Sequence, residues 1–221
     1  MINYVKNILP ILCLTLGACD VANGQEISPE TSSAPSSASS SASSSASRQE
    51  AVFAGGCFWC VEADFEKLPG VIEAISGYAG GHTKNPSYKQ VGRGGTGHYE
   101  VAKIIYDPTK VSYEQLLEHF WTTVDPTDAG GQFCDRGQVY ATAIFANEAQ
   151  FAQAQASKQA LQSSGRLSDP VVTPVLKSGP FYAAETYHQD YYKKNPIRYK
   201  YYRTGCRRDM KLKRLWGAHK G

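Results

Sequence analysis

The sequence predicts an α/β fold of the α+β type, a two-layer ferredoxin-like sandwich with extra helices and a long irregular C-terminal segment. Two observations support this fold class. In residues 49–221, short apolar strands and helical segments alternate irregularly, unlike the regular alternation of a doubly wound sheet. The same region spans about 173 residues without an internal repeat, which is long enough to bury one hydrophobic core.

Five short apolar runs are expected to form the strands of the sheet. They occupy residues 50–55, 71–78, 99–106, 139–145 and 171–176. The first run ends at Gly55-Gly56. The third alternates in part and ends at Asp107-Pro108. Turn residues that bound short apolar runs in this way are typical of strands.

Four helices are expected, at residues 57–68, 112–121, 147–164 and 185–194. Pro69-Gly70 ends the first helix. Ser112 begins the second, and Gln115 completes a capping box with it. Asn147 caps the third, an Ala/Gln-rich helix. Between the first two helices, the glycine-rich residues 80–97 are expected to form a loop.

Residues 1–19 predict an export signal of the lipoprotein type. Lys6 precedes an apolar run at residues 8–16, which is too short to span a bilayer. The run ends in LGAC, which resembles a bacterial lipobox in which Cys19 becomes lipidated. The alternative is an ordinary signal peptide with Cys19 near its cleavage site. Asp20 resembles the signal that keeps Gram-negative lipoproteins on the inner membrane.

Residues 20–48 predict a disordered linker between the signal and the domain at residues 49–221. The linker is rich in Ser and Ala and cannot bury enough apolar surface to offset the entropy lost on ordering. We expect it to hold the domain off a membrane on the periplasmic side. The net charge is +3, and loss of residues 1–19 removes a single lysine. An exported protein meets little nucleic acid, so we expect no nucleic-acid partner.

The motif AGGCFWCVE contains two cysteines, Cys57 and Cys60, on either side of Phe58 and Trp59. Cys57 falls where a strand passes into a helix, and the unpaired N–H groups of a helix start lower the pKa of a thiol. We therefore expect Cys57 to be a nucleophile. The two aromatic side chains predict an apolar slot for a small substrate group beside the sulfur.

The C-x-x-C spacing alone leaves several kinds of site open. A c-type haem site requires His after the second cysteine, where this chain has Val61. A zinc site requires a second close ligand pair, which Cys134 and Cys206 do not supply, so no metal is expected. Two alternatives remain: a dithiol–disulfide oxidoreductase, and a non-catalytic envelope lipoprotein with Cys57–Cys60 and Cys134–Cys206 bridges.

Six motifs in order narrow this choice. They are GGCFWCVE, GYAGG, Ser87-Tyr88, TGHYE, FCDRGQVY and AETYHQDYY. Together they resemble the A type of peptide methionine sulfoxide reductase, from about residue 51 to 216, here in a secreted lipoprotein form. The resemblance implies reduction of methionine S-sulfoxide, peptide-bound and free, in oxidised proteins. It also implies a thioredoxin-type dithiol as reductant, no cofactor and a monomeric domain.

The resemblance also assigns roles to the first motifs. Cys57 attacks the sulfoxide sulfur, and Phe58 and Trp59 enclose the methyl group. Glu100 supplies a proton to the sulfoxide oxygen. That oxygen leaves poorly unless it is protonated, so an acid whose pKa is raised by burial suits the reaction. Without the resemblance, Glu100 would be taken for an exposed carboxylate on a strand.

Three further residues on the substrate side follow from the resemblance: Tyr88, Tyr140 and Asp135. Without it, the tyrosines would be packing residues and Asp135 a turn residue. The chain departs from the family pattern at Val139 and Ala141, where Gln and Arg are common. The detail of that pocket wall is therefore open.

Attack by Cys57 leaves a sulfenic acid, which a second thiol must resolve. The family commonly uses a C-terminal cysteine, which matches Cys206. Cys60 is the second candidate and ranks below Cys206, because a helix is expected to strain a Cys57–Cys60 bridge. A relay between the two thiols is the remaining alternative. Cys134 is expected to be a small buried thiol.

Overall fold

The structure of the protein is a computed structural model, which describes residues 48–217. The predicted signal peptide, Cys19 and nearly all of the predicted linker lie outside these residues. Within residues 48–217, none of the helices is both long enough and apolar enough to cross a membrane.

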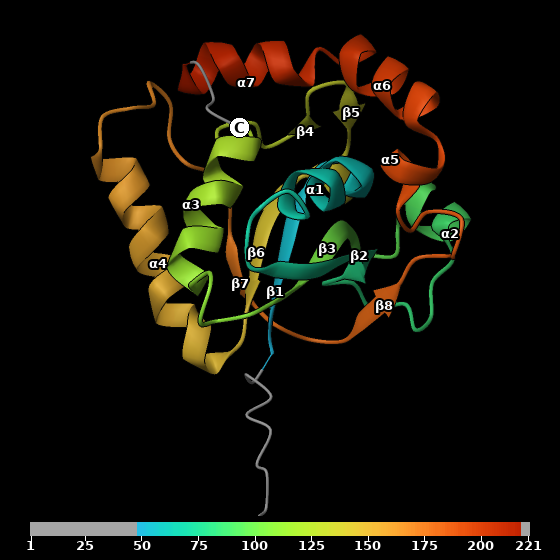
Figure 1. Ribbon diagram of the computed structural model, residues 1–221, viewed down its shortest axis with the longest axis horizontal. Helices are drawn as coiled ribbons and strands as arrows, with labels where there is room; N and C mark the ends of the chain where they lie inside the picture. The colour runs from blue at the N-terminus through green and yellow to red at the C-terminus, as the bar shows by residue number, and fades with distance from the viewer. Residues whose placement is uncertain (1–47, 218–221) are drawn as a thin grey trace, which may run out of the picture. The chain divides into compact units, whose positions relative to one another are not determined.

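A six-stranded mixed sheet forms the centre of the domain (Figure 1). Its strands are β7 (Val175–Lys177), β6 (Thr142–Ala146), β1 (Gln49–Gly55), β3 (Tyr99–Tyr106), β2 (Val71–Ala79) and β8 (Phe181–Ala183), in that spatial order. Neighbours are antiparallel except β6 and β7, which are parallel. The inner order β6-β1-β3-β2, with a helix after β1 and another after β3, confirms the ferredoxin-like sandwich.

Three helices pack on one face of the sheet: α1 (Phe58–Phe65), α3 (Tyr113–Thr123) and α4 (Glu148–Ser163). The alternation of β1 explains the core beneath them. Phe53 stacks on Phe65 and Phe120, with ring centroids 5.1 and 5.0 Å apart. Val52 and Ala54 point to the opposite face, which carries a smaller apolar cluster.

The capping box expected at Ser112 is present, and the N-cap expected at Asn147 is also part of a capping box, each with a glutamine three residues later. A third box, at Ser87, begins a short helix, α2 (Tyr88–Gly92), inside the expected loop. The strand expected at 139–145 begins only at Thr142, because a 3₁₀ turn, η1 (Gln138–Tyr140), precedes it. A two-stranded ribbon, β4 (Gly131–Gln132) and β5 (Asp135–Arg136), lies before that turn.

The end of the chain differs from the expected irregular segment. It forms α5 (Tyr191–Lys194), α6 (Pro196–Gly205) and α7 (Arg208–Trp216), and only the last four residues of the expected 185–194 helix are helical. Figure 1 shows α6 and α7 in red, crossing above α1 and α3. Pro196 provides a preorganised first turn for α6, and α7 is anchored by buried Arg208 and Leu212.

Candidate active site

Cys57 lies at the start of α1, where the backbone makes a tight turn. It is the N-cap residue, with ψ at 120°, outside the helical range. Gly56 before it has a φ of +86°, and a Cβ there would lie 2.6 Å from the Cβ of Gln132. Only glycine fits this turn without a shift of its neighbours. Arg208 Nη1 donates to the Gly55 carbonyl at 3.1 Å and so ties α7 to the turn.

A small cavity of about 50 Å³ opens beside the Cys57 sulfur. It is lined by Cys57, Phe58, Trp59, Tyr88, Glu100, Asp135, Tyr140 and Tyr202. The structure thus brings together the nucleophile, the acid and all the substrate-side residues expected from the sequence. Its size suits a group of a few atoms, since about 10–15 Å³ on the same measure is enough to hold one water.

Glu100 lies on β3 and is only 2 % exposed, so it is not a surface carboxylate. Its Oε2 accepts a hydrogen bond from the Phe58 backbone N–H at 3.0 Å. Burial raises the pKa of Glu100 to about 8, and the negative charges of Asp135 and Cys60 act in the same direction. The carboxyl is therefore largely protonated at neutral pH and can donate a proton into the cavity.

The two thiols of the motif are free and buried, with Cys57 6 % exposed and Cys60 1 % exposed. Burial raises the pKa of Cys57, and its hydrogen bond to Cys60 adds to this. The same hydrogen bond lowers the pKa of Cys60 to about 7, helped by the positive charges of Arg208 and Arg203. The pKa of Cys57 is thus raised by burial and not lowered as expected from its place at the helix start.

Trp59 and Phe58 form the aromatic wall of the cavity and are held by residues from the AETYHQDYY motif. The indole N–H of Trp59 donates to His188 Nδ1 at 3.1 Å. The same indole stacks on Tyr191, with ring centroids 3.7 Å apart. The His188 ring also lies 5.0 Å from Phe58 and 4.4 Å from Tyr88. The motif therefore fixes the wall rather than lining the cavity itself.

Tyr88 and Tyr140 present two hydroxyl groups to the cavity. Glu185 positions Tyr88 by accepting its backbone N–H at 2.9 Å. Burial raises the pKa of Tyr88 to about 12 and that of Tyr140 well above its usual value. Both phenols therefore stay protonated at neutral pH and can act as hydrogen-bond donors.

Tyr202 is a cavity residue that the sequence did not indicate. Its hydroxyl donates to Asp135 Oδ2 and also contacts the Cys57 thiol through a hydrogen bond. Burial raises the pKa of Asp135. The chain carries Tyr199, Tyr201 and Tyr202 close together on α6, and nothing in their spacing distinguishes the one that faces the cavity. Only the position of α6 over α1 does so.

Cys134 and Cys206 form a disulfide, with Cα atoms 5.0 Å apart. The expectation that Cys134 is a small buried thiol is therefore wrong, because this residue is exposed on the ribbon between β4 and β5. Cys206 is 9 % exposed and caps the C-terminus of α6. The long-range bond depends on the path of α6, which the sequence alone did not reveal.

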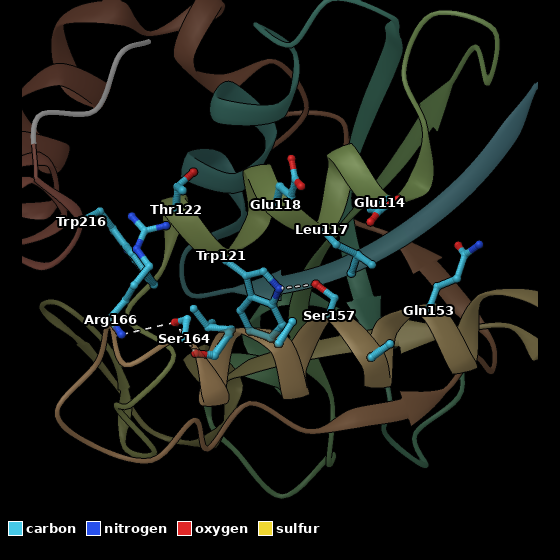
Figure 2. A pocket seen from close by; sticks show the side chains of 13 residues that line it. Glu114, Leu117, Glu118, Trp121, Thr122, Gln153, Ser157, Ser164, Arg166 and Trp216 are labelled. Carbon is cyan, nitrogen blue, oxygen red and sulfur yellow. Dashed lines mark hydrogen bonds between the residues drawn. The ribbon is translucent and has the colours of Figure 1, made fainter.

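A wider cleft of about 650 Å³ lies between α3 and α4, away from the cysteines. Figure 2 shows its lining, in which the Trp121 indole N–H donates to Ser157 at 2.8 Å. Alanines of α4 and Leu117 supply much of the remaining surface. Its lining holds no cysteine, histidine or tyrosine, whereas the smaller cavity at Cys57 holds the residues expected from the sequence and is the candidate reaction site.

Comparison with known proteins identifies a family. The model of the family described as peptide methionine sulfoxide reductase matches residues 49–220. Peptide methionine sulfoxide reductase MsrA of Bacillus licheniformis is 52% identical over 171 residues, which cover 77% of this chain and 94% of that protein. MsrA 2 of Rhizobium meliloti is 53% identical over 170 residues, 76% of this chain and 84% of that protein.

Solved structures agree with these sequence relatives. Methionine sulfoxide reductase A of Corynebacterium diphtheriae superimposes with a TM-score of 0.63 at 32% identity, over 68% of this chain and 76% of that one. The reduced form of Mxr1 from Saccharomyces cerevisiae gives a TM-score of 0.64 at 30% identity, over 68% of this chain and 87% of that one. Fold and sequence therefore point to the same family.

Proposed function

The chain belongs to the peptide methionine sulfoxide reductase family, and from this premise we propose how its cavity reduces methionine sulfoxide. The observation that carries the proposal is the meeting of three groups in one small cavity: the Cys57 thiol, the protonated carboxyl of Glu100 and the Phe58-Trp59 wall. The substrate is the S epimer of methionine sulfoxide, in peptides and as the free amino acid. The sulfoxide methyl group packs on the aromatic wall.

The first step is attack of the Cys57 sulfur on the sulfoxide sulfur. Because Cys57 and Cys60 share a hydrogen bond, and the pKa of Cys60 is about 7, Cys60 takes the proton that Cys57 gives up. Glu100 protonates the sulfoxide oxygen at the same time. Collapse of the adduct releases methionine and leaves a sulfenic acid on Cys57.

The second step resolves the sulfenic acid, and the geometry favours Cys60 over Cys206 for it. The thiols of Cys57 and Cys60 already contact each other, whereas Cys206 is bonded to Cys134. Cys57 is the N-cap, so the helix does not fix the pair rigidly as the sequence argument assumed. Attack by Cys60 expels the hydroxyl as water and forms a Cys57–Cys60 disulfide.

Reducing equivalents come from an external dithiol of the thioredoxin type, with no further cofactor. The N-terminal residues also indicate where in the cell the protein is located. We propose that residues 1–19 export the protein and that a lipid on Cys19 anchors it to the inner membrane, facing the periplasm. The support is the LGAC sequence, the Asp20 after it and the Ser/Ala-rich linker.

A stereospecific assay tests the proposed reaction. With dithiothreitol as reductant, the wild-type domain should convert methionine S-sulfoxide and leave the R epimer. Cys57→Ser should abolish conversion, and Cys134→Ser, a matched thiol loss, should still release methionine. Equal conversion of both epimers, or activity that survives Cys57→Ser, would contradict the proposal. Reduction of insulin disulfides without sulfoxide reduction would favour the oxidoreductase alternative.

A further inference from the structure

Helices α6 and α7 carry three of the six large apolar side chains that are exposed within residues 48–217. Ile197 and Tyr201 on α6 are each 84 % exposed, and Met210 on α7 is 49 % exposed. Single apolar side chains are common on protein surfaces, whereas several on one surface indicate an interaction site. These three therefore indicate that the two helices contact something outside the domain.

The three side chains lie on the outer faces of the two helices. Ile197 and Tyr201 are four residues apart and so lie next to each other on α6. Tyr202, on the inner face of the same helix, lines the reaction cavity. On α7, Leu212 is buried while Met210 stays exposed. Figure 1 shows α6 and α7 next to each other along one edge of the domain, so their outer faces form one surface.

Positive charge without counter-ions surrounds these side chains. Six exposed cations of α6, α7 and the turn between them make no ion pair within the described part of the chain: Arg198, Lys200, Arg207, Lys211, Lys213 and Arg214. The single acid of the two helices, Asp209, already pairs with Arg203. A cluster of such cations attracts an anionic partner. We refer to the three apolar side chains and the six cations as the α6–α7 surface.

We propose that the α6–α7 surface binds an anionic phospholipid membrane. Ile197, Tyr201 and Met210 enter the head-group region, and the cations lie against the lipid phosphates. Helices that combine apolar side chains with lysine and arginine bind bilayers in this way, through buried apolar area and attraction to anionic lipids. This role is separate from the proposed reduction of methionine sulfoxide and does not depend on it.

The shape of the surface favours a bilayer over a folded protein partner. The apolar side chains project from two convex helices, and none of them lines the Cys57 cavity or the cleft between α3 and α4. A protein partner would need a matching hollow for each side chain, because protein interfaces pack as closely as protein interiors. Lipid head groups rearrange around a side chain that projects. An acidic protein is the alternative occupant, and vesicle binding distinguishes the two.

The proposed anchor and linker allow this surface to reach a membrane. Figure 1 shows the start of β1 at the end of the domain opposite α6 and α7. Residues 20–48 could span up to about 100 Å when extended, and a domain of this size is about 40 Å across. A lipid on Cys19 would therefore keep the surface within reach of the bilayer. Binding through α6 would hold the reaction cavity beside the membrane, near oxidised membrane proteins.

Co-sedimentation with lipid vesicles tests the proposal. The described residues belong to one compact unit, so residues 48–221 can be studied without the proposed lipid anchor. The domain should bind vesicles of phosphatidylcholine and phosphatidylglycerol in equal amounts at least about tenfold more tightly than vesicles of phosphatidylcholine alone. High salt should weaken this binding, because it screens the charges. Equal affinity for the two kinds of vesicle would overturn the proposal, and absence of binding to both would overturn it in favour of an acidic protein partner.

Substitution of the apolar pair separates insertion from charge attraction alone. Ile197→Ser/Tyr201→Ser should lower the affinity for the anionic vesicles at least about fivefold, because less apolar area enters the bilayer. Ile72→Ser/Val172→Ser removes two apolar side chains that are 46 % and 40 % exposed elsewhere, and it should bind as the wild type does. An equal change in the two variants, or no change in either, would contradict the insertion of α6.

Charge reversal tests the cations in the same way. Lys200→Glu/Arg214→Glu should weaken vesicle binding at least about tenfold, and Lys84→Glu/Lys177→Glu, a reversal of two exposed lysines elsewhere, should weaken it less. An equal fall in both would show that only net charge matters, and the α6–α7 surface would not be the site. All four variants should reduce methionine S-sulfoxide with dithiothreitol at the wild-type rate, which shows that they are folded. A wild type without this activity would contradict the proposed function and leave the vesicle result unaffected.

Discussion

The carboxyl of Glu100 is protonated at neutral pH because β3 places it in the interior of the protein. The side chain is 2 % exposed, and its polar contact in the structure is the Phe58 N–H. That single hydrogen bond favours the charged form but does not offset the loss of solvent, so the pKa rises to about 8. An acid that is protonated at neutral pH is what a departing sulfoxide oxygen requires.

Replacing this carboxyl should slow the chemistry without disturbing the fold. Glu100→Gln keeps an oxygen that can accept the Phe58 N–H but has no proton to donate. We expect kcat/KM for methionine S-sulfoxide to fall by about 10²–10⁴-fold. Alkylation of Cys57 should remain close to the wild-type rate. Glu73→Gln, at an exposed position on β2, is the matched control. A rate that hardly changes would shift the acid role to Tyr88 or Tyr140.

The pH dependence of kcat/KM should reflect the titration of both Cys60 and Glu100. Activity should rise as Cys60 loses its proton near pH 7, because the thiolate accepts the proton of Cys57. It should fall as Glu100 loses its own proton near pH 8, because the acid form is then depleted. A profile of kcat/KM against pH should therefore be a narrow bell. In Glu100→Gln the alkaline limb should vanish, and its persistence would show that another group titrates there.

The residues that line the cavity could be predicted from the sequence, but their burial and hydrogen-bond partners could not. The motifs indicated seven of the eight cavity residues, because each has a fixed place in the chain. The raised pKa of Cys57 was not foreseen, since burial cannot be read from the C-x-x-C spacing. Tyr202 was missed, and the Cys134–Cys206 bridge was expected only under the non-catalytic alternative, because both depend on where a distant helix packs.

At the scale of elements, α7 connects the end of the chain to the beginning of the domain. Arg208 is 2 % exposed, and its guanidinium donates to the carbonyls of Gly55 and Thr123, at 3.1 and 2.7 Å. Its Nε also lies 3.8 Å from the Asp64 carboxylate on α1. One side chain thus joins α7, α3, α1 and the turn before Cys57.

Removal of this side chain should affect both stability and thiol chemistry. Arg208→Ala leaves two buried carbonyls and part of Asp64 without a partner, and we expect a loss of about 3 kcal/mol in the free energy of unfolding. Loss of the positive charge should also raise the pKa of Cys60, because the thiolate is less stabilised. Urea unfolding and the acidic limb of the pH profile measure the two effects. Lys213→Ala, an exposed loss of the same charge on α7, is the control, and an equal effect there would contradict this role.

The helices that were predicted and the helices that were missed differ in what stabilises them. α3 and α4 carry capping boxes, a local signal that the sequence displays directly. α7 has no side-chain cap and begins after Arg207, a non-glycine residue at a φ of +56°. Its charged sequence resembles a solvated tail, and its place is fixed by Arg208 and Leu212, whose partners lie far away in the chain.

At the scale of the whole molecule, the proposed lipid anchor at Cys19 would determine where the enzyme works. If Cys19 is lipidated, the full-length protein expressed in a Gram-negative host should enter the detergent-rich phase on Triton X-114 partitioning, because several acyl chains give stable membrane attachment. Cys19→Ala should leave the protein in the aqueous phase. Equal partitioning of the two forms would leave only the ordinary signal peptide as an explanation of residues 1–19.

The central claim is that Cys57 attacks the sulfoxide sulfur and becomes a sulfenic acid. The most direct measurement uses Cys60→Ser/Cys134→Ser/Cys206→Ser, which keeps Cys57 as the single thiol in residues 48–217. One equivalent of methionine S-sulfoxide is added without reductant, with dimedone to trap sulfenic acid. Because Cys60→Ser also removes the group that accepts the Cys57 proton, we predict slower release that still reaches one methionine per chain, with one dimedone adduct located on Cys57 by mass spectrometry. Methionine release without an adduct on Cys57, or no release at all, would contradict the account.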